Sequence, residues 1–247
     1  MTGFAHDHIV PDPNAGRDKK AQVAGMFDDI ARRYDFMNRF LSAGIDIGWR
    51  KKALRKLSAS APRELLDVAT GTAELAILAA RMLKPQQILG IDISEGMLEV
   101  GRKKIAAAGL SPIIQLRTGD SERIEAEDTS FDAVTVSFGV RNFADLTRGL
   151  TEIHRVLRPD GTILILEFSK PTTWGLRHLY RWYMNVLAPF FGGLFTRNPA
   201  AYRYLHASVQ HFPEGNAFLE VLQSAGFRQM TCEKLSFGIC SIYSAIK

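Results

Sequence analysis

One stretch, in which an apolar run gives way to a series of small residues, constrains the fold most strongly. Residues 64–68 have the apolar composition of a buried strand, and Ala69-Thr-Gly-Thr-Ala73 follows before a helical pattern over 75–81. A strand, a tight loop and a helix in this order form the first unit of a nucleotide-binding α/β sheet. Small residues let the backbone approach a ligand closely, and the free N–H groups of the helix start favour an anionic group there.

An acidic residue at the end of the next apolar run restricts the classes of ligand that the site could bind. The run that begins at Gln87 reaches Asp92, and an acid at the tip of the second strand suits the two hydroxyls of a ribose. Dinucleotide enzymes and S-adenosylmethionine methyltransferases both use this arrangement. A dinucleotide loop requires three glycines in G-x-G-x-x-G spacing, whereas Ala69, Gly71 and Ala73 alternate here, which favours S-adenosylmethionine. An ordinary βαβ turn with a solvated acid stays open on these residues alone.

The chain beyond Glu64 alternates between strand and helix patterns, which predicts a parallel sheet with right-handed crossovers. We expect Ser94 to cap a helix and Arg158-Pro-Asp-Gly161 to form a turn in which the glycine takes a positive φ. The predicted strands are 64–68, 87–92, 113–118, 131–137 and 161–167, and the predicted helices are 73–83, 95–107 and 144–157.

Two later loops carry further candidate ligand groups. The third strand ends in Asp120-Ser121, where a carboxylate can accept from the adenine amine and the next backbone N–H can serve a ring nitrogen, although many surface loops read the same way. The fourth strand runs through Ser137 into Gly139-Val-Arg141-Asn142. Ligands of open α/β sheets bind at this carboxyl end of a central strand.

The segments on either side of this alternation have different compositions. Residues 1–20 are expected to be a flexible segment, and residues 23–37 an amphipathic helix that covers the cofactor mouth, with Tyr34 either at the site or in the core. Residues 49–57 predict a second, basic helix. An apolar insertion at about 172–212 is too short to span a bilayer; it could line a pocket for a greasy substrate, lie against lipid or pack its own small core.

Composition bounds the function classes. The length of 247 residues suits a single domain, which we place at 21–247. The net charge of +5 permits contact with an anionic membrane. Because the chain has no Lys/Arg-rich block, no nucleic-acid partner is predicted. The N-terminus has no signal-peptide pattern, and two cysteines fit a reducing cytoplasm. No metal site is expected, because the histidines are scattered and the cysteine spacing fits no zinc pattern.

Together these motifs resemble the ubiquinone/menaquinone biosynthesis C-methyltransferase family of class I S-adenosylmethionine-dependent methyltransferases. The resemblance covers the chain from about residue 23 and is strongest at Ser137-Phe-Gly-Val-Arg-Asn142 and Leu166-Glu-Phe-Ser-Lys-Pro171. It implies an α/β, Rossmann-like class I methyltransferase fold, with a mixed seven-stranded sheet flanked by helices and closed by the antiparallel runs 228–235 and 239–246. It also extends to Tyr34-Asp-Phe-Met-Asn38, Leu41-Ser-Ala-Gly44, Leu66-Asp-Val-Ala-Thr-Gly-Thr72 and Leu157-Arg-Pro-Asp-Gly161.

The resemblance assigns roles residue by residue. Arg141 is the candidate for orienting a prenylated hydroquinone and stabilising phenolate charge, with a structural salt bridge as the alternative, and Tyr34 or a water is the candidate proton relay. Ala73 stands where the family usually has glycine, which puts cofactor affinity in doubt. The implied S-adenosylmethionine contacts are Gly71, Thr72, Asp92, Asp120, Ser121 and Ser137.

The implied reaction is C-methylation of a prenylated hydroquinone in the cytoplasm, with contact at the inner face of the membrane left open. The Phe237–Tyr243 ending favours demethylmenaquinol over 2-polyprenyl-6-methoxy-1,4-benzoquinol. The rivals are a methyltransferase acting on another hydrophobic phenol or a sterol-like lipid, a non-catalytic lipid-surface binding module, and a dehydrogenase. A homodimer is neither required nor excluded.

Overall fold

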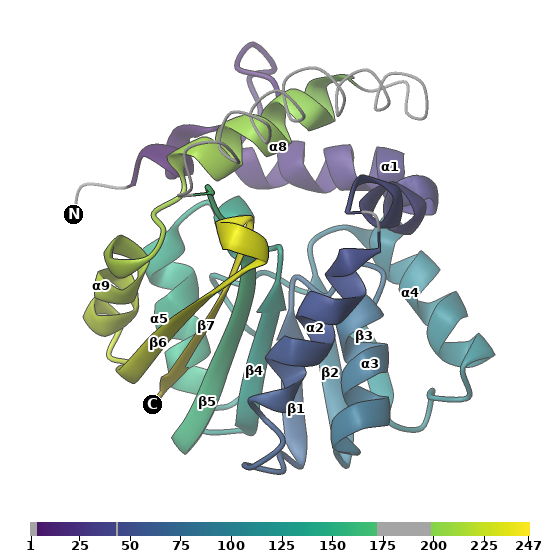
Figure 1. The fold of residues 1–247 in the computed structure, drawn as a ribbon. Helices are drawn as coiled ribbons and strands as arrows, with labels where there is room; N and C mark the ends of the chain where they lie inside the picture. Colours follow the sequence, from purple (N-terminus) through teal and green to yellow (C-terminus); the bar gives the residue numbers. More distant parts are fainter. Residues whose placement is uncertain (1–3, 43, 172–198) are drawn as a thin grey trace.

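The computed structural model describes residues 4–42, 44–171 and 199–247, and its centre is a seven-stranded sheet in the order β3-β2-β1-β4-β5-β7-β6. The first five strands pair in parallel, whereas β7 pairs antiparallel with β5 and with β6. The sheet is therefore mixed and flanked by helices, as expected (Figure 1).

Helices and strands alternate along the chain once the first two helices have passed. The strands are β1 (Glu64–Val68), β2 (Gln87–Asp92), β3 (Ile114–Thr118), β4 (Phe131–Ser137), β5 (Leu157–Phe168), β6 (Arg228–Leu235) and β7 (Cys240–Ile246). The α-helices are α1 (Lys19–Leu41), α2 (Ile45–Arg55), α3 (Glu74–Leu83), α4 (Glu95–Ala107), α5 (Leu146–Val156), α8 (Pro199–His211) and α9 (Asn216–Ser224). The 3-10 turns within the described residues are η1 (Ala5–His8), η2 (Val140–Asn142) and η4 (Ser236–Gly238).

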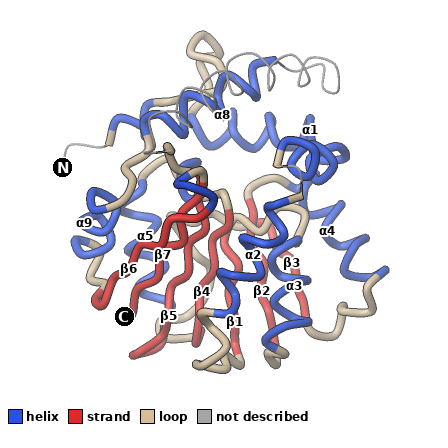
Figure 2. The backbone as a smooth tube through the Cα atoms, in the orientation of Figure 1, coloured by secondary structure: helices blue, strands red, loops and turns tan. Residues whose placement is uncertain are grey.

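Two apolar cores lie on opposite faces of the sheet. Neighbouring strand residues point to opposite faces, so Leu65 joins the core beneath α2 and α3, while Leu66 joins the core beneath α5 and α9. Both side chains are fully buried. Figure 2 shows the helices of these two layers on either side of the strands. The sheet is thus fixed from both faces, which leaves its carboxyl edge to carry the site.

Helices α1 and α8 do not belong to these layers but lie across the carboxyl ends of the parallel strands (Figure 1). The segment predicted as an amphipathic helix over 23–37 is the longer α1, and Asp18 caps its start by accepting from Ala21 N. An N-cap of this kind satisfies a backbone N–H that the helix leaves free. Helix α1 therefore lies across the edge of the sheet where the sequence places a cover (Figure 1).

Most predicted boundaries agree with the structure within two residues, and Ser94 caps α4 by accepting from Met97 N at 3.2 Å. Helix α2 begins four residues before the predicted 49–57, and the residues of the expected turn at 158–161 lie at the start of β5. Asp160, not Gly161, takes the positive φ of 61°. Gly161 is instead closely packed: an added Cβ would lie 2.7 Å from Arg158 O. The predicted positive φ at Gly161 was wrong: residues 158–161 form an irregularity in β5, where the pairing with β4 passes from Phe131/Leu157 to Ala133/Thr162, and Lys247 N donates to Gly161 O at 3.0 Å.

Residues 1–20 and the apolar insertion both lie outside the alternation of strands and helices. Part of the segment expected to be flexible packs on the domain, since His6 is fully buried and Lys19 Nζ donates to His6 O at 2.8 Å. Residues 172–198 of the apolar insertion lie outside the described residues, and only its end, in α8, is described. Over the described ranges, every helix falls short of the length and apolarity that crossing a membrane requires.

Candidate active site

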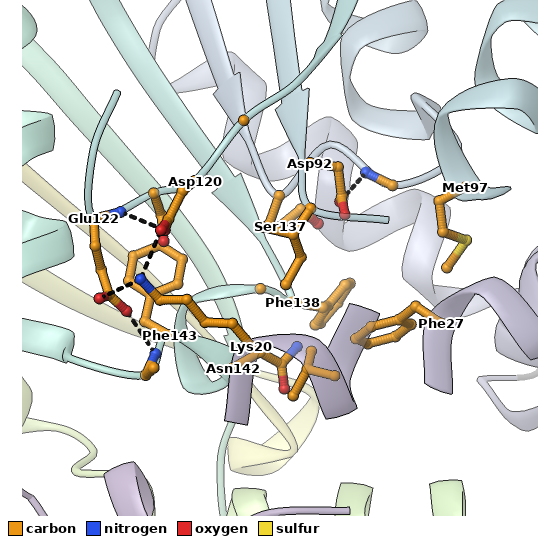
Figure 3. Close-up of a pocket in the computed structure, with 18 of the residues that line it drawn as sticks. Lys20, Phe27, Asp92, Met97, Asp120, Glu122, Ser137, Phe138, Asn142 and Phe143 are labelled. Atoms are coloured by element: carbon orange, nitrogen blue, oxygen red, sulfur yellow. Dashed lines mark hydrogen bonds and ion pairs between the residues drawn. The ribbon is translucent and has the colours of Figure 1, made fainter. Parts of the chain in front are cut away.

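A pocket opens between α1 and the carboxyl ends of β1 to β4, and Figure 3 shows the side chains that line it. Its volume is about 630 Å³, including the part that is open to solvent. Lining residues come from α1, the loops after β1, β2, β3 and β4, and the start of α4. This is the place where an open α/β sheet binds its ligands.

Asp92, at the tip of β2, forms one end of the pocket. Its carboxylate accepts from Gly71 N at 2.8 Å and from Ser94 N at 2.9 Å, which joins the loops after β1 and β2. Burial raises the pKa of Asp92, and the backbone N–H groups partly oppose that rise. Gly71 has a φ of 55°, which glycine adopts without strain. Both predicted residues therefore line the pocket, with a carboxylate held where a ribose can approach.

Asp120 and Ser121, after β3, also line the pocket. Asp120 Oδ1 accepts from Glu122 N at 2.9 Å, and its Oδ2 accepts from Lys20 Nζ at 2.6 Å. The same ammonium lies 2.7 Å from Glu122 Oε2 (Figure 3). Lys20 of α1 thus covers the carboxylate to which the sequence assigned the adenine amine, and this lysine was not among the predicted site residues.

Ser137, the last residue of β4, supplies the observation that most directly indicates a ligand. Its Oγ is buried, lines the pocket and has no hydrogen-bond partner among the described residues. A buried hydroxyl is normally hydrogen-bonded, so an unpaired one facing a pocket fits a bound polar group. Together with Asp92 and Asp120, this donor and acceptor set suits the hydroxyls and amine of a nucleoside, and the residues present therefore fit S-adenosylmethionine.

The next residue, Phe138, is held in an uncommon backbone conformation at the pocket wall. Its φ is 58°, its N donates to Leu166 O at 2.7 Å, and its ring stacks on Phe168 with centroids 4.5 Å apart. A positive φ in an aromatic residue is costly and is most often found at functional sites. The following Gly139 is needed for space, because an added Cβ would lie 2.5 Å from Ala69 Cβ.

Thr72 and Ala73 are not among the residues that line the pocket. Thr72 is buried, and its Oγ1 donates to Asp35 Oδ1 of α1 at 2.5 Å. The methyl group of Ala73 is fully buried in the core beneath α2 and α3, and the residue tolerates a φ of 62°. The structure therefore gives Thr72 a role in holding α1, and it directs the alanine methyl away from the cofactor side.

Arg141 lies in η2 behind the pocket wall and is not among the lining residues. Its Nη1 donates to Glu167 Oε1 at 2.7 Å and to Phe138 O at 2.6 Å, and both charged side chains are almost fully buried. This geometry supports the salt-bridge alternative, in which the guanidinium fixes Phe138. Tyr34, in contrast, does line the pocket. Burial raises the pKa of Tyr34, and the nearby Arg141 and Arg50 partly oppose the rise.

Three polar side chains fasten α1 over the pocket. Lys20 bonds to the loop after β3, and Asp28 accepts from Ser94 Oγ at 2.6 Å, after β2. Asp35 accepts from Thr72 Oγ1, after β1, and from Lys104 Nζ at 2.8 Å. Positions 20, 28 and 35 are about two helical turns apart, so one face of α1 meets three successive loops.

Several pocket residues were missed by sequence reasoning, among them Lys20, Phe27, Met97 and Asn142. A lysine, an apolar helix residue and a loop amide carry no motif of their own, and only Asn142 belonged to a motif that the sequence singled out. Within residues 4–42, 44–171 and 199–247, no group of His, Cys, Asp or Glu could hold a metal ion.

Comparison with known proteins agrees with this geometry. The model of the ubiE/COQ5 methyltransferase family matches residues 15–247. A protein of Bacteroides fragilis named demethylmenaquinone methyltransferase is 42% identical over 244 residues, 99% of either chain. A ubiquinone/menaquinone biosynthesis C-methyltransferase, UbiE, of Geotalea daltonii is 41% identical over 93% of this chain and 98% of its own. One solved structure with the same fold is a Thermotoga maritima protein described as an S-adenosylmethionine-dependent methyltransferase and possible histamine N-methyltransferase. Its TM-score is 0.65 at 17% identity, and the match covers 91% of this chain and 99% of that one.

Proposed function

The chain belongs to the ubiE/COQ5 methyltransferase family, and from this premise we propose that it methylates a ring carbon of demethylmenaquinol. It is an S-adenosylmethionine-dependent C-methyltransferase of menaquinone or ubiquinone biosynthesis. The finer choice of a naphthoquinol ring is carried by one observation: the Bacteroides fragilis relative, which matches from end to end, has a name specific to demethylmenaquinone.

Two groups of pocket-lining residues support a division between cofactor and acceptor. Asp92 and Asp120 offer carboxylate acceptors for the ribose hydroxyls and the adenine amine. Tyr34, Phe138 and Asn142 offer aromatic and amide surface, which suits a hydroquinone ring. S-adenosylmethionine, when bound, supplies an electrophilic methyl group, so the protein has mainly to hold and orient the acceptor. Positioning of this kind can lower the activation free energy by about 7–11 kcal/mol.

The acceptor becomes a better carbon nucleophile when its hydroxyl loses a proton. A phenol has a pKa of about 10, so at neutral pH the site must take or polarise that proton. Tyr34 lines the pocket, and burial raises its pKa, so it carries its own proton at neutral pH. It is therefore suited to a relay, in which it receives the proton of the quinol hydroxyl and passes its own proton to a water at the solvent-open side of the pocket. Arg141 acts indirectly, because its guanidinium donates hydrogen bonds to Phe138 O and Glu167 rather than to the acceptor.

Incubation with both candidate quinols and labelled S-adenosylmethionine tests this proposal. We expect the label in menaquinol, at a kcat/KM at least 10-fold above that for 2-polyprenyl-6-methoxy-1,4-benzoquinol, with mass spectrometry locating the methyl group on carbon. Exclusive labelling of the benzoquinol would transfer the function to ubiquinone biosynthesis. Label on oxygen, or none on either ring, would contradict the proposal.

We also propose contact with a membrane surface, because a polyprenyl tail partitions into lipid. Large apolar side chains remain exposed around the covering helices, including Phe237, at 78% exposure, and Ile45, at 51%. Trp49 Nε1 donates to Ser236 Oγ at 2.8 Å, which brings the start of α2 and η4 to the same side of the domain. Exposed Arg32 and Lys51 add positive charge that anionic headgroups would attract.

Vesicle flotation tests the contact. The protein should rise with vesicles that contain anionic lipid, and Phe237→Ser with Ile45→Ser should reduce that fraction while leaving thermal stability unchanged. The sequence offered the apolar insertion at about 172–212 as a surface that could lie against lipid, and residues 172–198 of it lie outside the described residues. Equal flotation of wild type and the double variant would remove the surface proposed here.

A further inference from the structure

Tyr204 of α8 reaches the pocket wall although it lies far along the chain from the strand-end loops. Its side chain is 3% exposed and packs with Val23 and Met26 of α1. Its hydroxyl donates to Oδ1 of Asn142 at 3.1 Å. Burial raises the pKa of Tyr204 well above its usual value, with the Arg141 charge opposing and the Glu167 charge adding to the rise, so the group remains a proton donor.

The bond fixes which end of the Asn142 amide faces the ligand. An asparagine presents an acceptor oxygen at one end and a two-proton donor at the other, and its orientation follows from the hydrogen bonds it makes. Since Tyr204 takes the oxygen, the Nδ2 donors are left for the pocket that Asn142 lines. Figure 3 shows Asn142 beside Lys20, with the nitrogen of its amide turned toward Phe138.

We propose that Tyr204 is a positioning residue for methyl transfer, which acts by holding the Asn142 amide as a hydrogen-bond donor to the ring oxygen of the acceptor. This inference rests on the proposed function. As the hydroxyl loses its proton, negative charge grows on that oxygen, and a donor held in place stabilises it more than the neutral phenol. Without Tyr204, the amide is free to turn and offer its oxygen, which repels the developing phenolate.

Tyr204→Phe tests the role with minimal disturbance, because it keeps the ring against Val23 and Met26. We expect kcat/KM for the quinol to fall by about 10-fold, which corresponds to the loss of one net hydrogen bond in the transition state. The Kd for S-adenosylmethionine, measured by calorimetry, should stay within about 2-fold of the wild-type value. Without cofactor, the affinity for 1,4-naphthalenediol, a neutral bare ring, should fall less than kcat/KM does, because the donor acts mainly on the developing phenolate. The matched control is Tyr243→Phe, which removes a buried hydroxyl that accepts from Gly215 N at 2.9 Å outside the pocket.

The combination of Tyr204→Phe with Asn142→Ala separates positioning from general damage. Asn142→Ala should cost about 100-fold in kcat, as for other donors to a developing oxyanion. The double variant should be no worse than Asn142→Ala alone, because Tyr204 has then nothing to hold. Asn142→Asp, which keeps the size and accepts from Tyr204 but lacks the donor, should be as inactive as Asn142→Ala.

Three results would overturn the inference. These are wild-type kinetics in Tyr204→Phe, a double variant in which the two losses multiply, or an equal loss in Tyr243→Phe. Failure of the proposed function looks different: the wild-type protein itself would transfer no methyl group to either quinol, and the inference would fall with it. A Tyr204→Phe defect in an enzyme that methylates the naphthoquinol supports both.

Discussion

Thr72 Oγ1 donates a hydrogen bond to Asp35 Oδ1 at 2.5 Å, and this contact joins the loop after β1 to the helix above it. Lys104 Nζ of α4 lies 2.8 Å from the other oxygen of the same carboxylate. Asp35 therefore bonds to two elements at the base of the pocket. Thr72, which family resemblance places against the cofactor, contributes to the site through the position of α1.

Replacement of Asp35 by alanine should loosen the cover over the cofactor. Loss of the two contacts should weaken S-adenosylmethionine binding by about 3- to 10-fold, mainly through faster dissociation, which stopped-flow fluorescence measures. Asp29→Ala is the matched control, because it removes an exposed carboxylate from the same helix. Equal dissociation rates for the two variants would show that this contact does not hold the cofactor in place.

Asp92→Asn should reduce cofactor affinity without unfolding the domain. The variant keeps an oxygen for Gly71 N or Ser94 N but loses the charge that ribose hydroxyls would bond to. A hydrogen bond to a charged group contributes about 1.5–3 kcal/mol, so the calorimetric Kd should rise by about 10- to 100-fold. An unchanged Kd in a normally folded variant would place the sugar elsewhere.

Asp67 should make stability depend on pH in the mildly acidic range. Burial raises its pKa from 3.8 to about 6, against the opposing hydrogen bonds from the Thr135 and Thr70 hydroxyls. The folded state thus binds this proton more tightly than the unfolded state, and the carboxyl destabilises the fold as the pH rises from about 4 to above 6, by up to about 3 kcal/mol.

Urea unfolding of wild type and Asp67→Asn at pH 4.5 and pH 7.5 checks this sign. The difference in unfolding free energy, variant minus wild type, should grow more positive at the higher pH. Constant offsets from the lost hydrogen bonds cancel between the two conditions. A difference that is equal at both pH values, or larger at pH 4.5, would contradict the raised pKa.

Arg141→Ala should destabilise the protein as a whole. It leaves Glu167 buried without its cation, which typically costs about 3–5 kcal/mol. Arg141→Met with Glu167→Leu removes both charges and should recover much of that loss in denaturant unfolding. If Arg141→Ala instead kept full stability and cofactor affinity but lost turnover, the guanidinium would be acting on the acceptor directly.

The central fold follows from local signals in the sequence. Residues 64–68, 87–92 and 131–137 are short apolar runs bounded by turn or helix signals, and their predicted limits match β1, β2 and β4. Asp92, Asp120 and Ser137 were predictable as site residues because each ends a strand or lies in the loop after one, and the carboxyl ends of parallel strands meet at one edge of the sheet.

Other parts depend on contacts between distant segments, which no local pattern records. Gly161 reads as a turn residue, but the C-terminal strand pairs with it and makes it part of β5. Lys20 and Tyr204 read as ordinary helix residues until the fold brings α1 and α8 over the strand ends. Arg141 belongs to a diagnostic motif, yet the motif does not reveal that Nη1 of its guanidinium donates to Glu167 and to Phe138 O.

The structure of the protein in complex with S-adenosylhomocysteine tests the central claim most directly. The account predicts the ribose hydroxyls within about 2.5–3.0 Å of the Asp92 carboxylate, the adenine beside Asp120, and the sulfur toward the end formed by Tyr34, Phe138 and Asn142. A nucleoside bound outside the space between α1 and the ends of β1 to β4, or a sugar away from Asp92, would contradict it.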